Sequence, residues 1–278
     1  MTLPLPAYSS WDRCASGAIL YHSGVWDYGG APAQAQVLNW ETGYPQTLPL
    51  PGDDEPYDPT FSYSPDCRTV ALADQDWIYL FDVDTTTLTK WTAGNRPAYS
   101  PDGQTLALER ERHLILKDVA SGDETVVEIL DDLLSGARSS LTRLSWGSTG
   151  TTLLLTLNYN DREPFGEDFV LVDLNERAVS VLQSSTGVAL SAPSLSPERR
   201  YVAYVNDALN RAGGSLRLYA GERACVVAEH PVTYADEVFW TPDGTRLLVT
   251  TWPGTEGDFL DVSGWLPTES ASAPCLDP

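Results

Sequence analysis

The stretch RPAYSPDGQTLALE, at residues 96–109, is the clearest copy of a pattern that recurs along this chain of 278 residues. A short segment that ends in an aromatic residue or Leu is followed by Ser-Pro-Asp-Gly and then by an apolar run. Proline presets φ for the first turn position, Asp accepts hydrogen bonds from nearby backbone amides, and Gly takes the position with positive φ. The pattern therefore predicts a β-hairpin at each copy.

Five further copies are visible. Three keep the proline: PTFSYSPDCRTVALA at 59–73, APSLSPERRYVAYV at 192–205 and EVFWTPDGTRLLVT at 237–250. The copy LTRLSWGSTGTTLLLT at 141–156 keeps the apolar spacing without Pro-Asp, and AYSSWDRCASGAILYH at 7–22 is the most degenerate. Cys67 stands where the turn should have Gly, so local strain or a different turn is expected there.

A third and a fourth strand candidate follow the hairpins. The third strands are expected at WIYLFDV from 77, HLILKDV from 113, DFVLVDL from 168, SLRLYAG from 215 and GDFLDVS from 257. Four strands in each repeat predict an all-β protein, a six-bladed β-propeller with four-stranded blades, because a lone blade cannot bury both of its faces. We expect one propeller domain over residues 1–266 and a flexible C-terminal tail over 267–278.

The sequence also predicts how the ring closes. TLPLP occurs at 2–6 and again at 47–51, where the outermost strand of the first blade belongs. The last blade ends after its third strand, so the N-terminal copy is expected to complete it. Proline suits an outer edge strand, whose donors need no partner.

At these residues the chain resembles the TolB-type propeller repeats, which also occur in propellers of prolyl-oligopeptidase relatives. Their blades carry a P-x-W-S-P-D-G hairpin followed by I-x-x-x-D; 98–103 and 239–244 match best, whereas the copies at Trp11 and Trp146 depart from it. The resemblance covers nearly all of the chain and implies a fold rather than a function. The catalytic domain that accompanies the peptidase propellers has no counterpart here.

Charge and composition narrow the function classes. The chain has 17 basic and 39 acidic residues, a formal net charge of −22, which disfavours nucleic acid and anionic lipid as partners. No apolar run reaches the length of a membrane span. The N-terminal segment MTLPLPAYSSWDRC shows neither a basic region nor an apolar core, so cytoplasmic residence is expected.

Catalytic and metal-binding patterns are weak. There are three histidines and no GxSxG elbow, and we expect His113 to be structural. Asp82, Asp118 and Asp173 recur at one blade position, which favours turns over calcium ligands. The four cysteines lack a CxxC pair, so no zinc site is predicted and free thiols are expected, with disulfides as the alternative for an exported protein.

The expected binding surface is the rim that holds the second-to-third loops and the connections between blades. Its long loops are acidic and aromatic, and long loops on a rigid scaffold commonly carry function. The candidate partner-binding residues are Trp26, Asp27, Tyr28, Asp53, Asp54, Glu55, Tyr57, Asp58, Tyr159, Asp161, Arg162, Glu163, Phe165 and Asp168.

The sequence favours a non-enzymatic adaptor or complex subunit that holds a protein partner and needs no cofactor; the acidic loops favour a partner with a basic surface. The alternative is a calcium-dependent or small-molecule hydrolase of the lactonase kind, with its site at the mouth of the channel.

Overall fold

The computed structural model describes residues 12–14, 19–23, 34–38, 45–48, 60–74, 76–128, 139–147, 150–159, 166–186, 193–196, 200–206, 214–220, 225–232, 235–241, 244–251, 256–265 and 275–276. These residues form an all-β structure of six antiparallel sheets, five with four strands and one with three. Within this part of the chain, no helix is long and apolar enough to cross a membrane.

Each sheet is built from strands that follow one another in sequence. The first contains β1 (Asp12–Arg13), β2 (Ile19–Ser23), β3 (Gln34–Leu38) and β4 (Pro45–Leu48). The second contains β5 (Thr60–Tyr63), β6 (Thr69–Asp74), β7 (Trp77–Asp82) and β8 (Thr87–Ala93). The third contains β9 (Asn95–Tyr99), β10 (Thr105–Arg110), β11 (His113–Asp118) and β12 (Glu124–Val126).

The second half of the chain repeats this order. The fourth sheet contains β13 (Ser139–Trp146), β14 (Thr152–Tyr159), β15 (Gly166–Asp173) and β16 (Ala178–Thr186). The fifth contains β17 (Ser194–Leu195), β18 (Tyr201–Asn206), β19 (Gly214–Ala220) and β20 (Cys225–Val232). The sixth contains β21 (Ala235–Trp240), β22 (Arg246–Thr251) and β23 (Glu256–Asp261).

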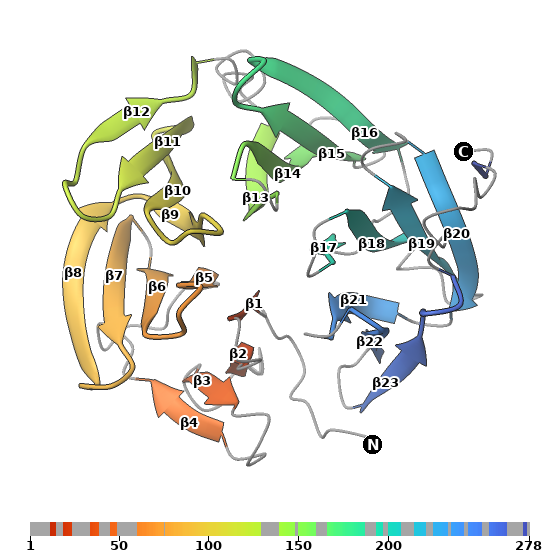
Figure 1. Ribbon diagram of the computed structural model, residues 1–278, viewed down its shortest axis with the longest axis horizontal. Helices are drawn as coiled ribbons and strands as arrows, with labels where there is room; N and C mark the ends of the chain where they lie inside the picture. Colours follow the sequence, from red (N-terminus) through yellow and green to blue (C-terminus); the bar gives the residue numbers. More distant parts are fainter. Residues whose placement is uncertain are drawn as a thin grey trace.

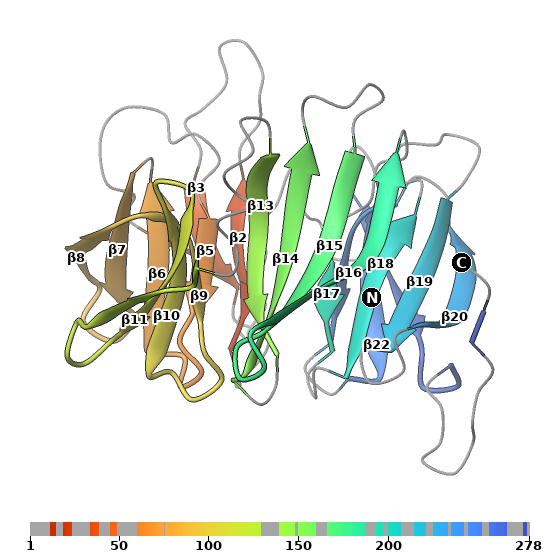
Figure 2. The same ribbon diagram turned by 90° about the horizontal axis from the view of Figure 1, so that it is seen from above.

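The sheets are arranged around a common centre, with the first strand of each sheet innermost (Figure 1). Seen from the side, the strands run across the thickness of the molecule between two rims (Figure 2). Strand alternation assigns the hairpin turns after the first and third strands to one rim, called the turn rim below. The second-to-third turns and the connections between sheets lie on the other, called the loop rim.

The core lies between neighbouring sheets, as stacked blades require. One cluster joins the second and third sheets through Ile78, Tyr99 and Leu106. Another joins the fourth and fifth through Phe169 and Tyr204, whose rings meet edge to face with centroids 5.2 Å apart.

Tryptophan side chains connect first strands across these boundaries. Trp146 at the end of β13 donates its indole N–H to the carbonyl of Ala98 in β9, at 2.8 Å. Trp240 at the end of β21 does the same to Ser194 in β17, at 3.1 Å. An aromatic residue before the turn thus ties its sheet to the preceding one.

The expectation of free thiols is wrong. Cys14 is bonded to Cys67 and Cys225 to Cys275, which leaves none of the four cysteines free. The physical reason is the repeat: hairpins of adjacent sheets lie side by side, so Cys14 and Cys67 meet despite a separation of 53 residues.

Two residues of the segment expected to be a flexible tail are attached to the fifth sheet. Cys275 is bonded to Cys225, and the amide of Leu276 donates to the carbonyl of Val226 at 2.9 Å. The expected pairing of residues 2–6 with the last sheet lies outside the described residues.

Candidate binding rim

On the turn rim, the aspartates of the first hairpins hold their own turns. Asp102 accepts a hydrogen bond from the Ser100 hydroxyl at 2.6 Å and another from the backbone amide of Gln104 at 3.0 Å. Asp66 makes the same pair of contacts with Ser64 and Arg68. The hydroxyl hydrogen bond is the main cause that lowers the pKa of both aspartates. These side chains close their own turns.

The aspartates that end the third strands behave alike, which confirms their predicted turn role. The Asp82 carboxylate accepts from the amide of Thr85 at 2.7 Å, and Asp118 accepts from the amide of Ser121 at 2.7 Å. Asp173 holds the next turn in the same way. The backbone hydrogen bonds lower the pKa of Asp82 and Asp118. Among the described residues, no group of three or more His, Cys, Asp or Glu side chains could hold a metal ion.

The loop rim is described mainly at the second and third sheets, and there it is not uniformly acidic. Trp77, the first residue of β7, is 41% exposed, and the Lys90 ammonium lies 3.5 Å from the centroid of its ring. A cation at this distance from an indole is attracted by the ring's quadrupole. This end of the second sheet thus presents an exposed, partly cationic aromatic surface.

The connection between the second and third sheets is strained. Arg96 has φ 51°, and its guanidinium pairs with Glu109 at 2.8 Å. Gly94 precedes it with φ 142°, and a side chain there would meet Leu108 at 2.6 Å, so only glycine fits. The backbone is therefore held tightly against β10.

The tight turn between β10 and β11 is also unusual. Glu111 and Arg112, its two central residues, have φ 52° and 67°, values that normally select Asn and Gly. His113 follows, exposed, as the predicted first residue of the third strand. Non-glycine residues with positive φ cluster at functional sites, where the strain is offset elsewhere in the structure.

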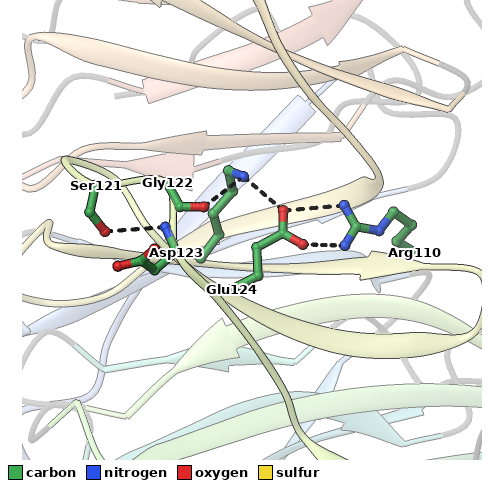
Figure 3. A network of polar contacts seen from close by, with 6 residues as sticks. Arg110, Ser121, Gly122, Asp123 and Glu124 are labelled. Carbon is green, nitrogen blue, oxygen red and sulfur yellow. Dashed lines mark hydrogen bonds and ion pairs between the residues drawn. The ribbon is translucent and has the colours of Figure 1, made fainter.

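An ion-pair network joins the end of β10 to the turn between β11 and β12 (Figure 3). Glu124 on β12 receives hydrogen bonds from Arg110 on β10 and from Lys117 on β11, the latter at 2.7 Å. Arg110, followed by Lys117, lowers the pKa of Glu124 to about 2. Lys117 also lies 5.2 Å from the ring centroid of Trp91 on β8. The network therefore joins three strands of the third sheet to the second sheet.

Two of the predicted partner-binding residues fall within the described part of the chain. Tyr159 ends β14. Asp168 lies within β15, opposite Leu157, and is only 6% exposed, so it belongs to the sheet rather than to the exposed rim. The reason is that the pairing of β14 with β15 continues to Tyr159 and Gly166, which shortens the expected loop.

The other predicted residues lie outside the described residues: Trp26, Asp27, Tyr28, Asp53, Asp54, Glu55, Tyr57, Asp58, Asp161, Arg162, Glu163 and Phe165. Trp77, Arg96 and Arg112 were not predicted from the sequence, because they lie in or beside short connections and only long loops were considered as binding loops. One pattern could have indicated this region: the charged pair Glu111-Arg112 stands in a two-residue turn, where Asn and Gly are usual.

No protein-family model matches the chain, and no curated protein matches its sequence. Its fold, however, is common among solved structures. TolB from Acinetobacter baumannii has a TM-score of 0.60 at 16% identity; the match covers 82% of this chain and 54% of TolB, so this chain spans about half the length of that protein.

Two further structures match over most of both chains. A chain of the mitotic checkpoint complex has a TM-score of 0.63 at 12% identity and covers 94% of this chain and 91% of its own. An oligogalacturonate lyase in complex with manganese has a TM-score of 0.54 at 14% identity, and the match covers 94% of this chain and 97% of the lyase. At these identities the likeness shows the fold alone: the chain has a β-propeller fold with repeats of the TolB-like and WD-like kind.

Proposed function

We propose that this chain is a non-enzymatic propeller that holds a protein partner on its loop rim. The observation that carries the proposal is the difference between the two rims. On the turn rim the carboxylates of Asp66, Asp82, Asp102 and Asp118 serve the turns themselves. On the loop rim, the described residues include the exposed Trp77, with the Lys90 ammonium over its ring.

The charge of the chain supports a basic partner surface. With a net charge of −22, the protein attracts cationic surfaces at long range, and the acidic segment Asp53, Asp54 and Glu55 is predicted from the sequence to lie on the loop rim. Aromatic side chains such as Trp77 supply contact area after docking. A propeller chain within the mitotic checkpoint complex shows that this fold occurs in protein assemblies.

We also propose that the six sheets are the six blades of a closed ring, with residues 2–6 as the fourth strand of the last one. The described part of the sixth sheet ends at β23, and β4 includes Thr47 and Leu48 of the second TLPLP copy in the equivalent place of the first sheet.

The test of the binding proposal reverses charge on each rim. The triple variant Asp53→Lys, Asp54→Lys and Glu55→Lys changes the loop rim. The matched control, Asp84→Lys, Asp123→Lys and Glu176→Lys, changes exposed acidic residues of the third-to-fourth turns on the turn rim by the same total charge. Partners are first identified by affinity purification from the native source, and one is then purified for titration.

We expect the loop-rim variant to bind the purified partner at least about tenfold more weakly and with a flatter salt dependence, whereas the control binds like the wild type. Equal affinity of the two variants would reject the loop rim as the binding surface.

The hydrolase alternative stays a prediction, and calcium titration tests it. A specific ion raises the melting temperature by mass action, and an adaptor shows no such rise.

A further inference from the structure

One position of the turn rim requires a left-handed backbone. The residue that closes the first hairpin of a sheet has φ 71° at Gly103, 70° at Gly150 and 68° at Gly244. In each turn its amide donates to the carbonyl three residues earlier, at 2.9 to 3.2 Å. Glycine adopts this conformation without steric cost, whereas a residue with a Cβ disfavours it.

Cys67 adopts the same conformation without the glycine. Its φ is 63°, and its amide donates to the carbonyl of Ser64 at 2.9 Å, so of the two expectations for Cys67 the structure shows local strain and not a different turn. The second sheet therefore keeps the turn and accepts the strain of a cysteine in the glycine position. The strain needs an offsetting gain.

The surroundings of the glycines show what that gain is. A Cβ at Gly103 would lie 3.2 Å from Pro65 in the turn of the preceding sheet, and one at Gly150 would lie 3.7 Å from Pro101. This position thus faces the preceding sheet's turn. At Cys67 the facing residue is Cys14, directly after β1, and the two Cα atoms are 5.2 Å apart, within the range of ordinary disulfides. A covalent bond takes the place of a van der Waals contact.

The second disulfide also joins two separate parts of the chain, β20 and the segment around Cys275. Cys225 begins β20, and its bond to Cys275 lies beside the backbone hydrogen bond from Leu276 to Val226. All four cysteines of the sequence are therefore used to hold one piece of the structure to another.

We propose that this protein matures in an oxidising compartment and that Cys67 occupies a glycine position because of its bond to Cys14. In forming that bond, the two thiols lose two protons and two electrons. The disulfide of a thiol–disulfide oxidoreductase accepts them by exchange and becomes two thiols. Under cytosolic reduction the pair would open, and Cys67 would keep its strain with no bond to offset it. The inference opposes the cytoplasmic residence expected from the N-terminal sequence.

The first test measures the cysteines in the native source. Cells are quenched in acid and their proteins alkylated with iodoacetamide before any reductant is added, and the chain is analysed by mass spectrometry. We expect no alkylated cysteine, and four after reduction of a parallel sample. Alkylation of Cys14 and Cys67 without reductant would overturn the proposal.

The second test isolates the glycine position. Cys14→Ser and Cys67→Gly both remove the bond, but only the second removes the residue with strained φ. In the same reductant, which opens Cys225–Cys275 equally, we expect Cys67→Gly to melt a few degrees above Cys14→Ser and above the reduced wild type. Without reductant, the wild type should melt highest. A Cys14→Ser variant that melts at or above Cys67→Gly would show that the turn does not select glycine there.

Discussion

Ser100 and Asp102 make a self-contained hydrogen-bonded unit at the turn of the third sheet. The Ser100 hydroxyl donates to Asp102 and accepts from the amide of Thr105 at 2.9 Å. Asp102→Ala removes the acceptor for Ser100 and Gln104, so we expect the free energy of unfolding to fall by about 1 kcal/mol in urea denaturation at neutral pH. Asp84→Ala, in an exposed turn of the second sheet, is the control and should change stability far less.

The effect of Asp102 depends on pH in a defined direction. The hydrogen bond from Ser100 lowers the pKa of Asp102 in the folded protein. The stabilising contribution of Asp102 is therefore present above the ordinary aspartate pKa of about 3.9 and is lost as pH falls through the lower pKa of the folded state. The gap between the wild type and Asp102→Ala should therefore close in strong acid. A gap that persists there would show that the carboxylate charge is irrelevant.

Glu124 tests the ion-pair network of the third sheet. Its pKa of about 2 means that its contribution is present above the ordinary glutamate value of about 4.3 and is lost as pH falls through about 2. Glu124 and Arg110 are both nearly a third exposed, so we expect Glu124→Gln to lower the free energy of unfolding by less than about 1 kcal/mol at neutral pH. The loss should shrink in high salt. Urea denaturation at two salt concentrations measures it, and a salt-independent loss would contradict the ion-pair explanation.

The junctions between neighbouring first strands carry the indole hydrogen bonds. Trp146→Phe keeps most of the buried ring but leaves the carbonyl of Ala98 without its indole donor. We expect the free energy of unfolding to fall by about 1 to 3 kcal/mol. Trp77→Phe, on an exposed tryptophan, is the control and should lower it much less. If both variants lowered the free energy of unfolding by similar amounts, the indole hydrogen bond of Trp146 would not contribute to joining the third and fourth sheets.

Strands and turns could be predicted from local sequence, whereas contacts between sheets could not. The apolar runs and Ser-Pro-Asp-Gly turns locate β5 to β11 closely, because strand period and turn chemistry act over a few residues. The partner of Trp146 is 48 residues away, and that of Cys67 is 53 residues away, so neither follows from a local pattern. The burial of Asp168 was missed because strand ends depend on how far a neighbouring strand continues to pair.

For the molecule as a whole, the repeat places six sheets around a common centre, and the closed ring proposed above needs a contact that completes the last sheet. Sheets one to six each pack against a neighbour through buried clusters, but the described part of the sixth sheet ends with β23. An open sheet edge has unpaired donors and acceptors that attract another strand. The repeated TLPLP supplies a strand of the same chain with the composition of β4.

The register of β4 makes that proposal specific. In the first sheet, Thr47 of β4 lies opposite Gln36 of β3, and Leu48 lies opposite Ala35. When β3 is aligned with β23 so that Leu38 matches Leu260, Gln36 corresponds to Asp258 and Ala35 to Gly257. Thr2 should then lie opposite Asp258, and Leu3 opposite Gly257.

Cysteine substitution tests this closing contact. The pair Thr2→Cys with Asp258→Cys should form a disulfide that peptide mapping detects, since directly opposed residues of an antiparallel pair lie close together. The control pair Thr2→Cys with Phe259→Cys is displaced by one residue, which turns the second side chain to the other face of the sheet. It should stay unlinked. Linking of the control alone would shift the register, and linking of neither would contradict the proposed pairing of residues 2–6 with the last sheet.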